Sequence, residues 1–426
     1  MAKSFFWHGF TDMSVIKDVE PLTIARGEGA YLFDIDGRRY LDASAGLWYC
    51  NIGHGRTELA EAALAQMSRL ESYSTFGDFT NEPVEVLAER LATLAPLTDA
   101  SVFFTNGGSD AIDSAIKLVR RYWQALGKPE RRVIISRHFA YHGANMGGTA
   151  LGGIAADREG YGELITDAMR IAWDSAEELE AAVKSVGADR IAAFVCEPII
   201  AAGGCLFPPE GYLDRVAEIC RANGILLIAD EVVTGFGRVG SWFASRRFEF
   251  EPDIIICAKG LTSGYLPMGA LIVDQRVAEP FYDGTVGPWY HGYTYSGHAT
   301  AAAVALANLD VIEREGLIEN VLDLEPALPR LMAPLTDHPA VAAVRTGHGL
   351  LAAVEFNAET ISRSRGRPAA VVAAMRRSGV LTRALVNGQI QFSPPLVVGR
   401  EQVQEFVDAV LAGLEATSDL EAVAAS

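Results

Sequence analysis

Cysteine is scarce in this sequence of 426 residues. The five cysteines are odd in number and no two of them have Cys-x-x-Cys spacing; they are Cys50, Cys196, Cys205, Cys220 and Cys257. This pattern argues against a disulfide framework and against a zinc site. We therefore predict free thiols that are buried or half-buried, and no metal site.

Long hydrophobic runs are also absent. No segment reaches the roughly 18–20 consecutive apolar residues that cross a bilayer. The first ten residues, MAKSFFWHGF, have one lysine and a short aromatic patch, and no small-residue cleavage site follows, so they do not resemble a signal peptide. These observations predict a cytoplasmic protein without a membrane partner.

Basic residues are outnumbered by acidic ones. The chain has 36 Lys and Arg against 54 Asp and Glu, which gives a net charge of −18. Such a chain lacks the basic surface that attracts nucleic acid or an anionic membrane. We therefore predict no nucleic-acid partner, and an anionic small molecule would need a local site that holds it against the overall field.

The sequence does contain a regular alternation of strand and helix signals. Half of its residues are hydrophobic, which is ample for a large core. Between Ser101 and Val273, apolar runs alternate with helical patterns such as residues 109–124 and 212–223; the runs are SVFFT, RVIIS, IAAFVCE, ILLIAD and DIIICAK. Continuous apolar strands separated by helices predict an α/β fold, with a mostly parallel sheet flanked by helices on both faces.

The segments on either side of this core have a different character. Residues 29–42 contain two apolar runs around the dipeptide Asp36-Gly37, which is typical of a β-hairpin turn. An alanine-rich helix is predicted over residues 298–315. We divide the chain into an N-terminal segment (residues 1–60), a large domain (residues 61–315) and a smaller α+β domain (residues 316–426), and we expect the first to pack with the last.

Polar residues follow the predicted strands, and open parallel sheets bind ligands outside the carboxyl ends of their strands. SVFFT is followed by NGGSD and VIIS by RHFAYHG; the next three runs lead to Glu197, Asp230 and Lys259. Any one of these residues alone is more simply a polar strand end or a helix cap. Gathered at one edge of a sheet, they predict a ligand site.

Three of these features match the three functional groups of one coenzyme. Gly108 and Ser109 stand where a helix begins, and its N–H groups favour a phosphate, although the stretch is neither a Walker A loop nor GxGxxG. Asp230, at the end of a buried strand, needs a cationic partner such as a protonated ring nitrogen. Lys259 follows an apolar strand, where a lysine has a lowered pKa and becomes a nucleophile toward aldehydes. Together these needs predict pyridoxal 5′-phosphate (PLP).

Two further residues complete this hypothesis. Tyr141 and Val232 both stand just past strand ends, where they would sandwich the flat ring of the coenzyme. The simpler alternative for Lys259 is a surface lysine that extends from a strand end into water. The apolar run IIIC before it and the stretch GLTSGYLPMGA after it make that alternative the weaker one.

Three longer stretches resemble the class III aminotransferases, which are fold type I PLP enzymes, and the likeness covers nearly the whole chain. They are LIADEVVTGFGRVG (residues 227–240), DIIICAKGLTSGYLPMGA (253–270) and HGYTYSGHATAAAVALA (291–307). The resemblance implies that Lys259 forms the Schiff base with PLP and moves the substrate proton, and that Asp230 keeps the pyridine nitrogen protonated. It also implies a homodimer with sites at the subunit interface, because Thr294 reaches the phosphate bound in the other subunit.

The resemblance also assigns the remaining contacts with the coenzyme. These residues are Tyr141 and Val232 on the two faces of the ring, Gly108 and Ser109 on the phosphate, and Glu197 in the family's Glu-Pro motif. The sequence departs from the family in two places. Gly107 replaces a hydroxyl residue of the phosphate loop, and Ile200 replaces a glutamine near the ring.

Within the class, the chain most resembles the ω-amine:pyruvate transaminases. Trp48, in GLWYCNIGHGR, stands where that group has an aromatic wall of the substrate pocket. Arg383, in VLTRALVNGQIQFSPPLV, stands where it has a mobile arginine, although the loop after it looks one residue longer. Such an arginine binds the carboxylate of pyruvate through two hydrogen bonds and swings away for an apolar amine. The alternatives are core packing for Trp48 and a surface ion pair for Arg383.

The expected activity is a transamination in two half-reactions. An amine or ω-amino acid donor leaves its amino group on the cofactor, and a keto acid, most simply pyruvate, takes it up in a ping-pong mechanism. Other possibilities stay open: 2-oxoglutarate as the acceptor, an aminomutase or decarboxylase on the same fold, or a PLP-binding protein without activity. A nucleotide-binding protein is disfavoured because the Walker lysine is missing.

Overall fold

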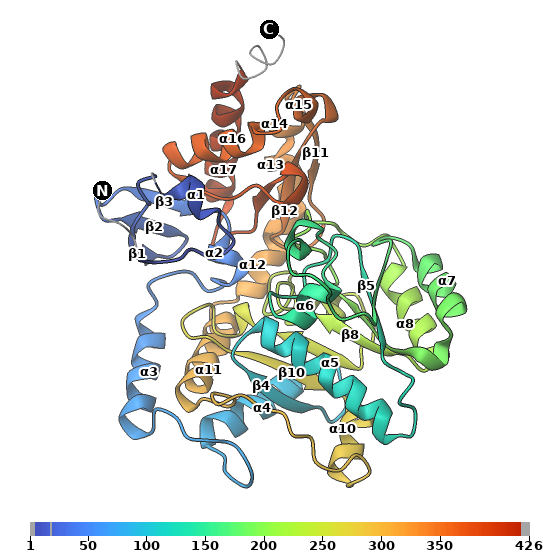
Figure 1. Cartoon of the computed structure of the whole chain (residues 1–426). Helices are drawn as coiled ribbons and strands as arrows, with labels where there is room; N and C mark the ends of the chain where they lie inside the picture. The colour runs from blue at the N-terminus through green and yellow to red at the C-terminus, as the bar shows by residue number, and fades with distance from the viewer. Residues whose placement is uncertain (1–4, 18, 419–426) are drawn as a thin grey trace.

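The computed structural model describes residues 5–17 and 19–418, so the first four residues of the stretch assessed as a signal peptide lie outside the described residues. Figure 1 shows a long sheet surrounded by helices in the middle part of the chain, with the N-terminal strands and the C-terminal helices gathered beside each other at one end. The α/β fold predicted from the sequence is confirmed.

The central sheet has seven strands in the order β4-β10-β9-β8-β7-β5-β6. They are β4 (Ser101–Thr105), β5 (Val133–Arg137), β6 (Ala168–Ile171), β7 (Ile191–Cys196), β8 (Leu226–Asp230), β9 (Ile254–Cys257) and β10 (Gly269–Val273). Strands β5 to β9 are parallel, whereas β10 runs antiparallel to both of its neighbours. The carboxyl ends of the parallel strands therefore lie at one edge of the sheet.

The strands in the middle of this sheet are buried along their whole length, which explains their uninterrupted apolar sequences. The five strands predicted from the sequence are all present. The prediction did not include β6, a short, partly exposed edge strand that carries an arginine, or β10. Strand β10 follows the Lys259 turn so closely that no α-helix, only the short 3₁₀ helix at Lys259–Leu261, separates it from β9, and it pairs antiparallel for that reason.

Helices surround the sheet. The helical elements of this part of the chain are α3 (Thr57–Arg69), α4 (Glu82–Leu94), α5 (Gly108–Ala125), α6 (Met146–Leu151), α7 (Ala176–Val186), α8 (Tyr212–Ala222), α9 (Ala244–Arg247), α10 (Gln275–Tyr282) and α11 (Ala299–Arg314), with the short 3₁₀ helices η1 (Ala156–Arg158), η2 (Ala188–Arg190) and η3 (Lys259–Leu261). Helix α5 packs its apolar face, including Ile112 and Val119, on Ile228 and Ile256 of the sheet. The expected helices at residues 109–124, 212–223 and 298–315 correspond to α5, α8 and α11.

The N-terminal hairpin joins a sheet completed by the far end of the chain. This sheet contains β1 (Ile24–Glu28), β2 (Tyr31–Asp34), β3 (Arg39–Asp42) and β13 (Val380–Leu381), in that order. The predicted hairpin turn forms between β2 and β3, where Asp34 Oδ1 accepts the N–H groups of Asp36 and Arg38. Strand β3 pairs with β13 in parallel. The boundaries proposed after residues 60 and 315 stay predictions.

The C-terminal part adds a three-stranded sheet and further helices. The strands are β11 (Val341–Arg345), β12 (Ala352–Phe356) and β14 (Ile390–Phe392). The remaining helical elements are α1 (Met13–Ile16), α2 (Ala45–Trp48), α12 (Leu317–Leu324), η4 (Glu325–Ala327), α13 (Leu328–Leu331), α14 (Ala333–Thr336), α15 (Ala358–Arg363), α16 (Arg367–Arg377), η5 (Val386–Gly388) and α17 (Arg400–Ala416).

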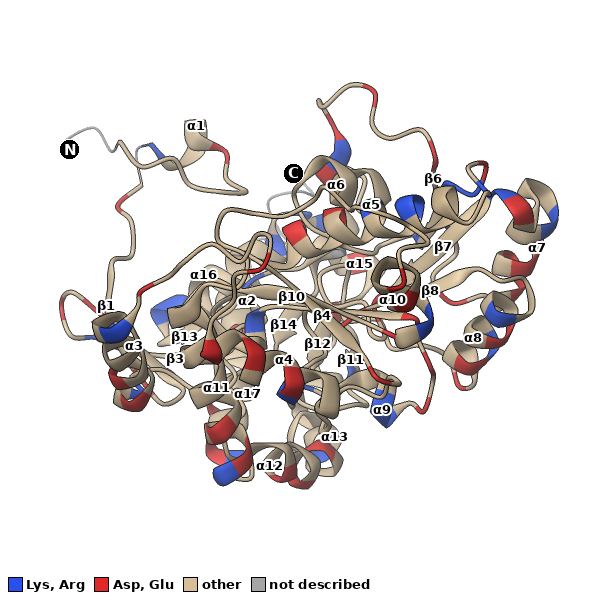
Figure 2. Cartoon of the chain, turned by 90° about the horizontal axis from the view of Figure 1, so that it is seen from below, with Lys and Arg blue, Asp and Glu red and all other residues tan. Residues whose placement is uncertain are grey.

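Charge and thiols are distributed as expected for a folded chain with an apolar interior. Figure 2 shows the acidic and basic residues mostly on outer helices such as α7 and α8, while the strands in the middle are largely free of them. All five cysteines are buried and unpaired. Within residues 5–17 and 19–418, no helix has the length and hydropathy of a membrane span, and no group of three or more His, Cys, Asp or Glu residues could hold a metal ion.

Candidate active site

The carboxyl edge of the central sheet brings the predicted residues together. Strand β7 leads directly into Glu197, β8 ends at Asp230, and β9 is followed within two residues by Lys259. The loops after β4 and β5 reach the same edge, because Ala144 after β5 donates its N–H to Ser109 Oγ at 3.0 Å. Only tertiary pairing of the strands creates this group, since its members are spread over about 150 residues of the sequence.

Asp230 has a partner that the sequence reasoning missed. The Nδ1 atom of His142 lies 2.8 Å from Asp230 Oδ2, and the N–H of Val232 donates to Oδ1 at 3.2 Å. His142 is completely buried, and no other described residue bonds its Nε2 atom. A carboxylate at this position is thus oriented by two donors. The signal for His142 was its place directly after Tyr141 in AYHG.

Lys259 lies in an unusual backbone conformation at the entrance to the short helix η3. Its φ angle is +42°, which is rare for a residue with a Cβ atom. Burial lowers the pKa of Lys259 to about 8, although the carboxylates of Asp230 and Glu197 act in the opposite direction. About a tenth of the amine is therefore uncharged at pH 7, far more than for an ordinary lysine, and the uncharged form is the nucleophile toward a carbonyl.

The glycine-rich loop forms an open backbone cradle at the start of α5. Gly107 precedes the helix, and a Cβ atom there would meet nothing within 4 Å, whereas a Cβ on Gly108 would press against Val232 at 3.1 Å. Ser109 Oγ accepts one N–H group, which leaves its own hydroxyl hydrogen available. The free N–H groups of the first turn suit a phosphate. No other side chain fills the space that a hydroxyl residue would occupy at position 107, so this space stays open.

Glu197 fixes the backbone on both sides of the site. Its Oε1 atom accepts the N–H of Tyr141 at 2.9 Å, and its Oε2 atom accepts the N–H of Ala201 at 3.2 Å. Burial raises the pKa of Glu197, while His142 acts in the opposite direction. Glu197 thus holds the loop that carries Tyr141. Ile200, the second departure from the family pattern, is fully buried and forms a backbone bridge with Leu206.

Trp48 and Arg383 join this group from distant parts of the chain. The Lys259 Nζ atom lies 5.1 Å from the centre of a Trp48 ring, and the Arg383 Cζ atom lies 4.5 Å from it. Trp48 is also packed among Ile199 and Leu351, so it is both a core residue and a neighbour of Lys259. No carboxylate of the described residues lies within ion-pair distance of Arg383. The cation–π contact is its main interaction here.

Two other groups influence the Arg383 guanidinium. Burial lowers the pKa of Arg383, and Tyr141 and Asp157 act in the opposite direction. Asp157 lies in η1, and burial raises its pKa. The sequence reasoning did not identify Asp157. Its stretch, GGIAADREG, contains no strand or motif that would place it beside this site.

Thr294 is the one predicted site residue that this chain keeps away from the group. It is exposed, in the segment before α11. That segment is held by its own chain, where Thr75 Oγ1 donates to the carbonyl of Ser296 at 2.9 Å and Asn81 Nδ2 donates to that of Gly297 at 2.9 Å. Its predicted contact with a phosphate in the other subunit stays a prediction.

The family model described as Aminotransferase class-III matches residues 13–413 of the chain. The chain is a class III aminotransferase. It is 39% identical over 433 residues to the putrescine–pyruvate aminotransferase of Pseudomonas aeruginosa, with 96% of this chain and 94% of the relative covered. It is 38% identical to the diaminobutyrate–2-oxoglutarate transaminase of Halomonas elongata, with 92% and 89% covered.

Solved structures place the aminotransferase in fold type I, as expected from the sequence. An amine transaminase from an uncultivated Pseudomonas species, in its PLP-bound form, superposes with a TM-score of 0.93 at 38% identity, covering 97% of this chain and 99% of that one. The cofactor of the aminotransferase is PLP. The site fits it: an open cradle precedes α5, a buried carboxylate is oriented by His142, and Lys259 has a lowered pKa.

Proposed function

We propose that this enzyme transfers an amino group from an amine or ω-amino acid to a keto acid, most readily pyruvate, by a ping-pong mechanism. One observation carries the proposal: Trp48 lies against both the Lys259 ammonium and the Arg383 guanidinium, at 5.1 Å and 4.5 Å from the ring centre. The reacting amine and a carboxylate-binding group thus share one aromatic wall.

PLP, when bound, supplies an aldehyde that condenses with amines and a ring that accepts the electron pair released at the substrate carbon. In our proposal Lys259 holds the cofactor and then carries the proton between donor carbon and cofactor, which its pKa of about 8 allows near neutral pH. Asp230 pairs with the ring nitrogen. Gly108 and Ser109 hold the phosphate, and Tyr141 and Val232 flank the ring.

Arg383 explains in this scheme how one pocket accepts two unlike substrates. Its guanidinium binds the carboxylate of the keto acid through two charge-assisted hydrogen bonds. Since no carboxylate anchors it among the described residues, Arg383 can leave the pocket when an apolar amine enters. Trp48 then provides an apolar surface for the donor. The relatives named above differ in acceptor, so the choice of pyruvate over 2-oxoglutarate is part of the proposal.

We also propose a homodimer with Thr294 at the partner's phosphate. The exposed segment around Thr294 borders a hollow of about 1330 Å³, whose lining includes the solvent-facing rings of Phe76, Phe79 and Tyr290. Aromatic side chains gathered in one hollow are typical of a protein interface. Sedimentation and the PLP retention of Thr294→Ala test this. The cytoplasmic location stays a prediction.

A donor panel with pyruvate and 2-oxoglutarate in competition tests the main proposal. Donors would include diamines, ω-amino acids and aromatic amines, and the products alanine and glutamate would be quantified. We expect mainly alanine, and initial-rate plots that are parallel, as ping-pong kinetics require. More glutamate than alanine would contradict pyruvate as the preferred acceptor. Product formation without any keto acid would instead indicate an aminomutase or a decarboxylase.

A further inference from the structure

The turn that carries Lys259 has a strained backbone. Both Lys259 (φ +42°) and Ser263 (φ +48°) have left-handed backbone conformations, which persist only where the surroundings enforce them. Within the turn, the backbone bonds are those from Leu261 N to Ala258 O at 2.8 Å, from Thr262 N to Lys259 O at 3.3 Å and from Tyr265 N to Thr262 O at 3.1 Å, and none of them involves the backbone of Ser263. Contacts from elsewhere in the chain must therefore support it.

Asn308 of α11 binds two backbone carbonyls of the turn. It is completely buried, and its Nδ2 atom donates to the carbonyls of Gly260 and Leu261 at 2.8 Å and 3.0 Å. These are the first two carbonyls after Lys259. Among the described residues its Oδ1 atom has no hydrogen-bond partner, which is unfavourable for a buried acceptor. An apolar residue would avoid that cost, so the donor side of the amide is the reason for an asparagine here.

Asn51 lies close to the same turn. Its amide leaves no room for a side chain at Gly260, because a Cβ atom there would come within 2.5 Å of Asn51 Nδ2. The Nδ2 atom donates to Phe236 O at 2.8 Å, and Oδ1 accepts from Nη2 of the buried Arg238 at 3.0 Å. Asn51 is thus fixed to the loop that follows Asp230, and it stands three residues after Trp48.

We propose that Asn308, which binds the carbonyls of Gly260 and Leu261, and Asn51, which packs against Gly260, are positioning residues that set the backbone of Lys259 and the direction of its side chain. The inference rests on the proposed role of Lys259. Because Asn51 and Trp48 belong to one segment, the contact of Asn51 with Gly260 also fixes the distance between the Lys259 amine and the Trp48 ring.

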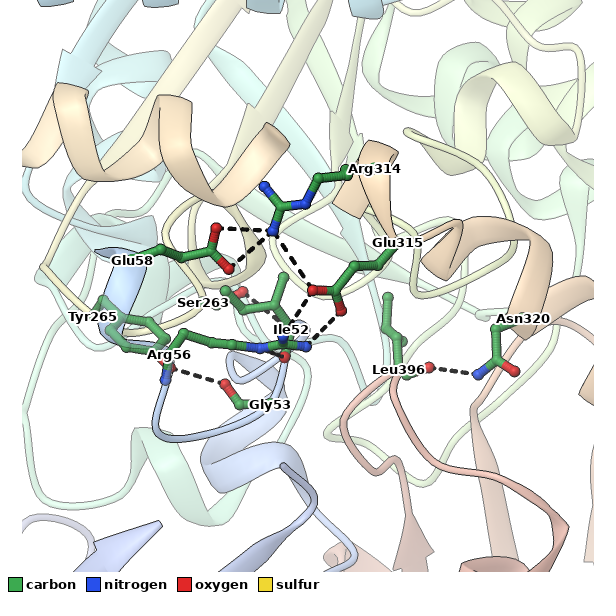
Figure 3. A network of polar contacts seen from close by, with 10 residues as sticks. All are labelled: Ile52, Gly53, Arg56, Glu58, Ser263, Tyr265, Arg314, Glu315, Asn320 and Leu396. Atoms are coloured by element: carbon green, nitrogen blue, oxygen red, sulfur yellow. Dashed lines mark hydrogen bonds and ion pairs between the residues drawn. The ribbon is translucent and has the colours of Figure 1, made fainter. Parts of the chain in front are cut away.

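Figure 3 shows that this segment continues along the turn. Ile52 N donates to Ser263 Oγ at 3.3 Å, and the hydroxyl of Tyr265 donates to Gly53 O at 3.0 Å while it accepts the N–H of Arg56 at 2.8 Å. Arg56 in turn forms a double hydrogen bond with Glu315 at the end of α11. The N-terminal segment and α11 therefore enclose the Lys259 turn as one unit.

The chain offers a matched pair of variants. Asn320 of α12, also shown in Figure 3, donates through Nδ2 to the carbonyls of Leu396 and Val398 at 2.7 Å and 3.0 Å, the same chemistry as Asn308 but on another segment. We expect Asn308→Leu to lower kcat by about 10²-fold through misplacement of the amine, with the donor KM changed less than about threefold. Asn320→Leu should keep kcat within about threefold.

A second readout does not depend on turnover. The apoenzyme is mixed with PLP, reduced with borohydride at intervals, and the adduct at Lys259 is quantified by peptide mass. Asn308→Leu should form this adduct at least about tenfold more slowly than the parent and Asn320→Leu. Thermal midpoints measured in parallel identify any loss of stability.

Several outcomes would overturn the inference. If Asn308→Leu keeps the parent's kcat and adduct rate, or loses only thermal stability, the amide has no positioning role. If that variant does not fold, Asn51→Asp replaces it: it keeps the acceptor for Arg238 but loses the donor to Phe236, and we expect a kcat loss of about tenfold. No loss there would contradict the proposal. A parent that lacks transamination would instead refute the proposed function.

Discussion

The strand that ends at Asp230 is held in a different way from the two segments that carry Trp48 and Arg383. Asp230 ends a strand paired on both sides, so its position follows from the ladder of β8. Trp48 instead follows a left-handed stretch, with φ angles of +46° at Ala45 and +61° at Trp48 itself. Side-chain contacts enforce that stretch.

The carboxylate of Asp42 supplies several of these contacts. It accepts the N–H of Ser44 at 3.1 Å and that of Gly46 at 2.8 Å, and it lies 2.9 Å from His54 Nε2. The backbone of Arg383 is held by a hydrogen bond of its carbonyl, which accepts the N–H of Gln391 at 3.1 Å. The comparison indicates that strand pairing fixes Asp230, whereas side-chain contacts and loop hydrogen bonds hold the irregular segments of Trp48 and Arg383.

Substitution of Lys259, beside the end of Asp230's strand, should have the largest effect. We expect Lys259→Ala to lower kcat by at least about 10⁴-fold, because in the proposed function Lys259 is both the attachment point for PLP and the proton carrier. Steady-state transamination and borohydride trapping measure this. The exposed Lys184→Ala is the control and should match the parent. Turnover retained in Lys259→Ala would contradict the proposal that the reaction takes place at the carboxyl edge of the central sheet.

Asp230→Asn should have the next largest effect. The amide keeps the size of the side chain and an acceptor for Val232 N, but it loses the negative charge that, in the proposed function, pairs with a protonated ring nitrogen. We expect kcat to fall by about 10²–10³-fold with an unchanged thermal midpoint. A rate near that of the parent would show that the charge is not needed.

Arg383→Met should have a smaller and selective effect. We expect the KM for pyruvate to rise by about 10- to 100-fold, since two hydrogen bonds to a charged group are lost, while the KM for an apolar amine stays within about threefold. Separate variation of the two substrates measures this split. Arg26→Met, at an exposed position, is the control. Equal changes in both KM values would contradict the substrate-selective role.

The pH dependence of Lys259 should give the smallest effect. With a pKa of about 8, the free amine makes up about a tenth of the population at pH 7 and about nine tenths at pH 9, so the rate of adduct formation with PLP should rise about tenfold. Borohydride trapping across this range measures it. An ordinary lysine reaches half-deprotonation only near pH 10.4. A midpoint above about pH 10 would show that burial does not tune this amine.

The sequence alone determined the parallel strands and the polar residues at their ends, because buried strands of a parallel sheet must be apolar throughout and their ligands lie at the carboxyl edge. The combination of Gly108, Asp230 and Lys259 was sufficient to predict PLP. The sequence could not reveal β10 as antiparallel, since its apolar residues read like any other buried strand.

The tertiary structure alone decided which distant groups meet. The contact of His142 with Asp230, and those of Trp48 with Lys259 and Arg383, join residues 88, 211 and 335 positions apart, respectively. No local pattern encodes such contacts, because they arise from packing of whole elements. The contacts of Asn51 and Asn308 with Gly260 also join distant residues. Neither asparagine stands out in its own segment, and only the fold brings both to one turn.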